Sequence, residues 1–156
     1  MSKIASIATY PISVPLKHKY WTAHEAASAA NMVLVEVRTD DGVTGYGPVH
    51  GSPLKKICDW VDKLGTLVKG MDATATSIVW EKLFSLNAPR RGGIMARDGM
   101  PSPLPRADRP QITAAIGGID TALWDIKGKI AGMPVYRLLG GENRPVFTTP
   151  RAATTG

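Results

Sequence analysis

Histidine is the side-chain type best suited to acid–base or metal chemistry near neutral pH, and the 156-residue sequence contains three: His18, His24 and His50. None has a second metal-binding residue at the spacing of a known zinc motif, and an HExxH segment is absent. His24 and Glu25 are adjacent, so their side chains point in different directions on a helix or a strand. The sequence therefore predicts no metal site built from this chain alone.

His50 stands at the end of a predicted strand, just before Ser52, which is a good helix N-cap. The backbone amides at a helix N-terminus can bind an anion such as a carboxylate. The alternative is that His50 is an ordinary exposed histidine, and the sequence leaves both interpretations open.

The acidic residues and the lone cysteine do not form a catalytic set. Asp120 and Asp125 lie five positions apart on a predicted helix, so their side chains diverge instead of converging on one substrate. Asp125 precedes Lys129 by four residues, which favours a helical ion pair. Cys58 has no assignable base and is interpreted as a core cysteine. We therefore predict no catalytic residue within this chain.

Composition narrows the class of protein. The chain is 44% hydrophobic, with a net charge of +6 and one cysteine, so we expect a globular domain without a disulfide. It shows neither a secretion signal nor an apolar run long enough for a membrane helix, which favours a cytoplasmic location without a membrane partner. Five arginines lie in residues 88–110 among many prolines and glycines, a composition that favours a loop over a nucleic-acid-binding surface.

Alternating apolar residues predict strands at 10–16, 32–39 and 43–49, with residues 18–30 as a loop and residues 40–42 as a hairpin turn. Pro11 and Pro15 place the first strand at a sheet edge. Gly45 and Gly47 share one face of the third strand, which indicates that a helix or another backbone approaches that face closely.

Helical spacing of apolar residues predicts helices at 53–69, from Thr74 or Thr76 to about residue 86, and at 112–131. We expect the adjacent pair Gly117 and Gly118 to let the last helix pack closely on the sheet. A short helix follows Pro134, and residues 146–149 form a possible fourth strand. The predicted fold class is α+β, a three-stranded antiparallel meander followed by a helical bundle.

Two segments resemble a known family. Residues 31–47 (NMVLVEVRTDDGVTGYG) and 114–141 (AAIGGIDTALWDIKGKIAGMPVYRLLGG) are similar to the amino-terminal capping domain of the mandelate racemase and muconate lactonizing enzyme group of the enolase superfamily. The resemblance extends over roughly residues 3–147 and implies an enolase N-terminal domain-like fold. It implies a capping domain at residues 1–142, with 143–156 as the remnant of the first barrel strand or a disordered tail.

The resemblance also implies an activity. Family members join this cap to a TIM barrel and abstract a proton next to a carboxylate, with Mg²⁺ stabilising the enediolate; they include racemases, cycloisomerases and acid-sugar dehydratases. The family's metal ligands and bases lie on the barrel, and none of its positions matches a residue here. We therefore expect a truncated chain that binds no cofactor and is inactive unless a barrel is supplied.

Two cap loops of the family contact the substrate, and by position they match residues 18–30 and 49–53. Trp21, His24 and His50 are thus candidate contacts for a carboxylate-bearing small molecule, a hydroxy acid or sugar acid; the alternative is that they are merely exposed loop residues. Residues 90–110 fall where family members vary in length. A second hypothesis is a non-catalytic interaction module that covers its barrel-facing surface by self-association, and with either hypothesis we expect a homo-oligomer.

Overall fold

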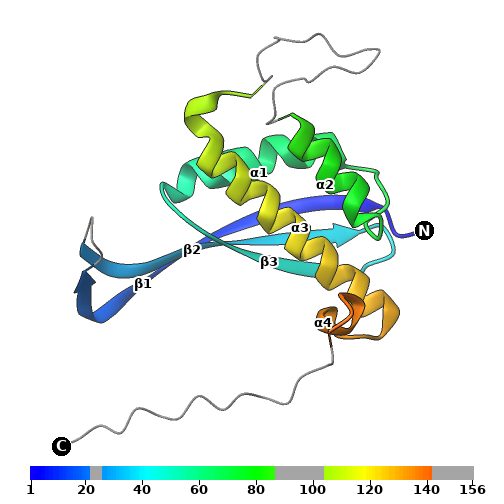
Figure 1. Cartoon of the computed structure of the whole chain (residues 1–156), viewed down its shortest axis with the longest axis horizontal. Coiled ribbons are helices and arrows are strands. Elements are labelled where there is room, and N and C mark those ends of the chain that lie inside the picture. Colours follow the sequence, from blue (N-terminus) through cyan, green and yellow to red (C-terminus); the bar gives the residue numbers. More distant parts are fainter. Residues whose placement is uncertain (22–25, 87–103, 142–156) are drawn as a thin grey trace, which may run out of the picture.

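The computed structural model describes residues 1–21, 26–86 and 104–141. Strands β1 (Ile4–Trp21), β2 (Ala26–Thr39) and β3 (Thr44–His50) come first, followed by helices α1 (Leu54–Val68) and α2 (Thr76–Ser85), a 3₁₀ turn (Arg106–Asp108), α3 (Arg109–Ala131) and α4 (Val135–Leu138). Figure 1 shows the sheet on one side and the long helix α3 crossing it. This arrangement confirms the predicted α+β class with an antiparallel meander followed by helices.

The sheet has three antiparallel strands in the order β1-β2-β3, so β1 is an edge strand, as its prolines predict. Ile12 of β1 pairs with Met32 of β2, and Met32 pairs in turn with His50 at the end of β3. The alternating residues Val33, Val35 and Val37 of β2 are fully buried. They face the helices, and this face of the sheet forms half of the core.

The predicted loop at residues 18–30 is wrong over most of its length. β1 continues to Trp21 and β2 begins at Ala26, and the two strands form a long ribbon that extends beyond the helices (Figure 1). Strand pairing alone satisfies the backbone of such a ribbon, so its residues need no alternation of apolar and polar side chains. A register shift between Pro15 and Tyr20 further interrupts the pattern.

The helices supply the other half of the core. The apolar stripe of α3 is buried from Ile112 to Ile126, but Ile130 is 45% exposed. Gly132 ends α3 in the left-handed conformation, with φ of 62°, as the sequence predicts. The N-cap prediction for Ser52 is wrong: α1 begins one residue later, and Pro53, which has no side-chain acceptor, occupies the cap position. Most of α1's apolar residues are buried, and Cys58 is half-buried against the core.

The helix α3 lies directly on the backbone of β3. A Cβ atom at Gly47 would stand 2.0 Å from the carbonyl oxygen of Gly118, and one at Gly45 would stand 2.1 Å from that of Ala122. This confirms the close approach predicted from the two β3 glycines. Of the helical pair, only Gly118 faces the sheet, since Gly117 has open space beside it.

Several predictions fall at the borders of the described structure. The 3₁₀ turn and the first residues of α3 occupy 106–110, so the predicted arginine-rich loop ends earlier than residue 110, and its residues 90–103 lie outside the described ranges. The possible strand at 146–149 and the boundary at residue 142 also lie outside them. Within the described residues, none of the helices is both long enough and apolar enough to cross a membrane.

Candidate functional site

A groove of about 710 Å³ lies between the β1–β2 ribbon and the end of β3. It runs from the middle of the ribbon to the turn that joins β3 to α1. Its lining residues come from three segments of the chain: Ile12 and Val14 of β1, residues 26–32 of β2, and His50, Gly51 and Ser52. The groove therefore joins the two regions that the family resemblance singled out.

Small side chains leave the space for this groove. Four of the five residues at 26–30 are alanine and the fifth is Ser28, so β2 presents little more than backbone and methyl groups. The polar groups on its walls are the side chains of Ser28, Asn31, His50 and Ser52. Among the described lining residues there is no carboxylate, lysine or arginine. Such a surface can hydrogen-bond a polar ligand and exclude water, but it offers no pair of groups for acid–base catalysis.

The position of His50 is fixed by its surroundings. His50 is the last residue of β3 and is exposed, and the chain turns immediately after it at Gly51, whose φ of 143° strongly favours glycine. A Cβ atom at Gly51 would also meet the Ile57 side chain of α1 at 3.2 Å. One residue further on, the Ser52 carbonyl accepts a hydrogen bond of 2.9 Å from the Gln111 side chain of α3. Two helices thus hold the turn that carries His50.

The other two predicted contact residues are placed differently. Trp21 is the last residue of β1, pairs with Ala26 across the ribbon, and is 78% exposed. It lies near the ribbon end and does not line the groove. His24 lies outside the described residues. Of the two candidates that the structure describes, only His50 lines the groove, and a substrate contact by any of the three stays a prediction.

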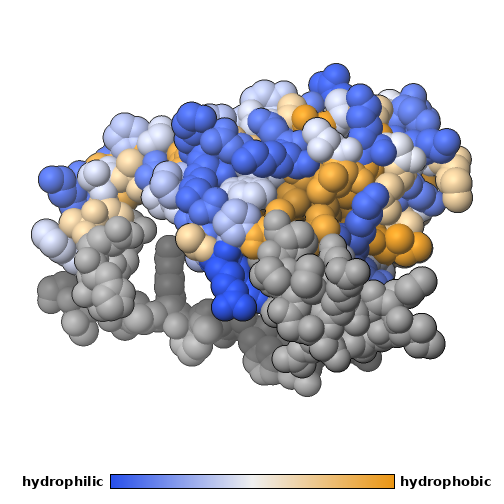
Figure 2. Space-filling view, turned by 90° about the horizontal axis from the view of Figure 1, so that it is seen from above, coloured by the Kyte–Doolittle hydropathy of each residue, from blue (hydrophilic) through white to orange (hydrophobic). Residues whose placement is uncertain are grey.

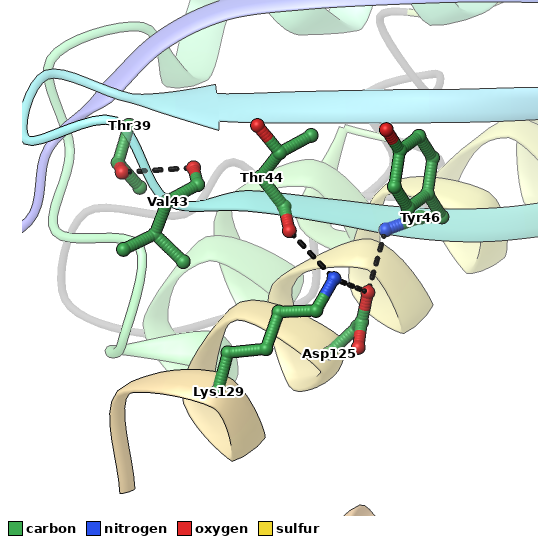
Figure 3. A network of polar contacts seen from close by, with 6 residues as sticks. All are labelled: Thr39, Val43, Thr44, Tyr46, Asp125 and Lys129. Atoms are coloured by element: carbon green, nitrogen blue, oxygen red, sulfur yellow. Dashed lines mark hydrogen bonds and ion pairs between the residues drawn. The ribbon is translucent and has the colours of Figure 1, made fainter. Parts of the chain in front are cut away.

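A network of hydrogen bonds and an ion pair holds β3 against α3 (Figure 3). The predicted ion pair of Lys129 with Asp125 forms at 2.8 Å, and both side chains also reach the β3 backbone. The Tyr46 amide donates to Asp125 at 3.0 Å, and the Lys129 ammonium donates to the Thr44 carbonyl at 2.7 Å. Because β3 ends in His50, this network also steadies one wall of the groove. Sequence spacing could find the ion pair but not its β3 partners, which are 79 and 85 residues away.

Charged groups elsewhere stabilise the fold. The Lys56 ammonium and, more weakly, the Trp60 indole N–H lower the pKa of Asp108 and tie α1 to the start of α3. Hydroxyl groups of Ser2 and Thr39 lower the pKa of Asp41 in the β2–β3 turn. In the described part of the chain, no three metal-binding side chains lie close enough together to hold an ion.

Comparison with known proteins places this architecture in a family. Residues 6–140 match the family model for the N-terminal domain of mandelate racemase and muconate lactonizing enzyme. A D-galactonate dehydratase of Xanthomonas euvesicatoria pv. vesicatoria (strain 85-10) is 35% identical over 125 residues, which are 80% of this chain and 28% of that protein.

Solved structures agree with this assignment. The 3,6-anhydro-D-galactonate cycloisomerase from Zobellia galactanivorans is 30% identical with a TM-score of 0.67, over 92% of this chain and 33% of that one. An enolase from Bradyrhizobium, solved with magnesium and mandelic acid, shares the fold at 24% identity and a TM-score of 0.68, over 93% of this chain and 36% of that one. The chain thus spans 28% of the dehydratase and about a third of each of the two solved chains. It belongs to the mandelate racemase and muconate lactonizing enzyme N-terminal domain family of the enolase superfamily.

Proposed function

We propose that this chain is the capping, substrate-specificity domain of a magnesium-dependent enolase-superfamily enzyme that acts on a hydroxy acid or sugar acid. The observation that carries the proposal is the groove in which His50 and the ribbon meet, in a domain of this family. A dehydratase and a cycloisomerase that act on galactonate compounds are among its relatives, which favours a sugar acid. Capping loops of this kind exclude water and contact the distal end of the substrate.

The chemistry divides between two parts of such an enzyme. A proton next to a carboxylate is very weakly acidic, so a divalent cation must stabilise the charge that develops when it is removed. The described residues of this chain do not fit a magnesium site, so the ion and the base would be held elsewhere in the protein. His50, Asn31 and Ser28 would contribute hydrogen bonds to substrate hydroxyl or carboxylate groups. The 156 residues alone are expected to be inactive.

A chimera tests this division. The purified chain is assayed with D-galactonate and Mg²⁺. In the chimera, residues 6–140 of this chain replace the matching region of the Xanthomonas dehydratase. We expect no turnover by the chain alone and turnover by the chimera. His50→Ala in the chimera should raise KM about tenfold with little change in kcat, because a uniform binding contact is lost.

His18→Ala is the matched control, since His18 is an exposed histidine of β1 that does not line the groove. Equal kinetic constants for the His50 and His18 variants would remove His50 from the substrate site. Turnover of a sugar acid by the 156-residue chain itself would overturn the proposed division of labour.

The second candidate is a non-catalytic module that associates with itself. It is favoured by exposed apolar side chains that extend from the end of α3 to just after α4: Ile130, Met133, Tyr136 and Leu139 are 45%, 44%, 51% and 63% exposed. Sedimentation at micromolar concentration distinguishes the candidates only together with the chimera assay, since a homo-oligomer is expected with either. Self-association that Leu139→Ser and Tyr136→Ser abolish, together with an inactive chimera, would favour the module. A monomer would exclude it.

A further inference from the structure

A second concave site lies between α2 and α3, with a volume of about 490 Å³. Seen from above in Figure 2, the described surface is largely hydrophilic apart from one hydrophobic area, and none of the residues that line the cleft belongs to the hydrophobic end of that colour scale. The cleft combines two indole rings with two carboxylates and two hydroxyls. Its lining residues are Thr76, Ser77, Trp80 and Glu81 of α2, and Asp120 and Trp124 of α3. None of them lines the groove at His50.

Two polar groups of this cleft have no partner in the described structure. Thr76 is only 2% exposed, and its hydroxyl oxygen is buried without any hydrogen bond. Asp120 is half-buried, and burial alone raises the pKa of its carboxyl group. A buried polar group without a partner costs free energy, so native proteins seldom retain one unless something else satisfies it. Both residues line the same cleft, where the half-buried Asp120 carboxylate is open to an occupant and the Thr76 hydroxyl lies beneath the surface.

The aromatic rings favour a planar or cationic occupant. Trp80 stacks on Phe84, with ring centroids 4.5 Å apart and an angle of 11° between the planes. Trp124 already accepts one cation, since the Lys127 ammonium lies 4.8 Å from its ring centroid. Asp120, Trp124 and Lys127 follow one another along one face of α3, so the cleft lies on the Asp120 side of the Trp124 ring. An indole is the aromatic group that binds cations best.

The charges of the cleft determine whether a cation or an anion can bind there. Glu81 and Asp120 bring two carboxylates, whereas the N-terminus of α2, at Thr76, contributes only about half a positive charge. An anion would therefore be repelled, and a cation attracted. A guanidinium ion is planar and weakly hydrated, stacks on aromatic faces, and donates several hydrogen bonds in its plane.

We propose that the α2–α3 cleft binds a guanidinium group carried on a short apolar stem. The group would stack against the indoles of Trp80 and Trp124 and donate hydrogen bonds to the Asp120 carboxylate. The stem would occupy the apolar part of the cleft. The proposal does not rest on the capping function, because it uses no residue of the groove at His50.

The test is a titration of the full 156-residue chain, labelled with ¹⁵N, with ethylguanidinium chloride. The chain has four tryptophans, and each gives one indole N–H signal. We expect the signals of Trp80 and Trp124 to shift saturably. The signals of Trp60, which is buried and bonded to Asp108, and of Trp21, which is 78% exposed on the ribbon, serve as internal references. N-ethylurea, which has nearly the same shape but no charge, should leave all four unshifted.

Variants assign the binding groups. Asp120→Asn should weaken binding about tenfold, because it removes a charge-assisted hydrogen bond. Glu81→Gln should also weaken binding, because it removes the second carboxylate of the cleft. Asp62→Asn is the matched control, a lost carboxylate on the exposed side of α1.

Three outcomes would overturn the proposal. One is that no probe concentration shifts the signals of Trp80 and Trp124 while leaving the signal of Trp60 unchanged. Another is an equal response to N-ethylurea, which would show that charge is not recognised. The third is unchanged affinity in the Glu81→Gln variant together with equal losses in the Asp120 and Asp62 variants, which would indicate unspecific attraction.

Discussion

Replacing Gly118 by alanine should destabilise the domain, whereas the same change at the adjacent Gly117 should stabilise it. Both positions lie inside α3, so both gain the same helix preference of about 1 kcal/mol. Their surroundings differ. A Cβ atom at Gly117 meets nothing within 4 Å, but one at Gly118 would lie 2.2 Å from a methyl carbon of Val49 and 2.9 Å from one of Val35. Valine has few rotamers with which to move aside.

The clash sets the magnitude of the effect. Carbon atoms in contact lie about 3.5–4.0 Å apart, so α3 and the sheet must separate by more than about 1 Å at Gly118. Overpacking of this kind costs about 1–3 kcal/mol, and we expect the upper end because the Gly118 carbonyl already lies against Gly47. After the helix gain, Gly118→Ala should lower the free energy of unfolding by about 2 kcal/mol. The two variants should then differ by about 3 kcal/mol, or roughly 6–12 °C in Tm.

Urea unfolding followed by circular dichroism measures both variants under the same conditions. The substitution is identical, so effects on the unfolded chain cancel in the difference between them. The same sign of change in both variants would refute the reasoning, because it would show that α3 is not in backbone contact with the sheet at Gly118. A stabilised Gly118→Ala variant would refute it more directly.

Three further predictions concern stability. Asp125→Asn should lower the free energy of unfolding by about 1 kcal/mol, because it weakens the bonds to Lys129 and the Tyr46 amide; urea titration should show less than half this loss for Asp62→Asn. Gly132→Ala should cost about 1 kcal/mol, since alanine resists the φ of 62° that ends α3, and an unchanged Tm would contradict this. Hydrogen bonds or an ion pair lower the folded-state pKa of three groups: Asp41, Asp72 and Asp108. The stability that they contribute should therefore be full above the ordinary aspartate pKa of 3.8 and be lost as the pH falls below it, which unfolding measured against pH would show. Asp120 acts with the opposite sign, because its raised pKa makes the folded state bind the proton more tightly. Asp120→Asn should therefore steepen the loss of stability at acid pH, and a shallower loss would contradict this prediction.

The centre of the fold could be predicted because its residues are buried. The valines at 33, 35 and 37 alternate since one face of β2 is covered, and the isoleucine stripe of α3 recurs at helical spacing for the same reason. Gly45 and Gly47 even indicated which strand face the helix approaches. The outer ribbon gave no such signal. Residues 15–19, 21 and 26–30 are exposed or half-buried, so strand pairing there leaves no periodic pattern in the sequence.

The two concave sites could be predicted only in part, because binding surfaces are built from residues that the core does not use. His50 could be placed, since it ends a recognisable strand. The groove beside it depends on alanines of β2 that the sequence alone does not place: Ala30 lies opposite Val14 only after the strands have paired, and pairing register is not a local property of the sequence. The α2–α3 cleft joins Trp80 to Trp124, 44 positions apart by their residue numbers, and the periodicity of either helix alone does not bring them together. A periodic pattern in the sequence shows which residues are buried, but not which polar groups lack a partner. Thr76 and Asp120 lack one, and only the packed structure shows the cleft between α2 and α3 that they line.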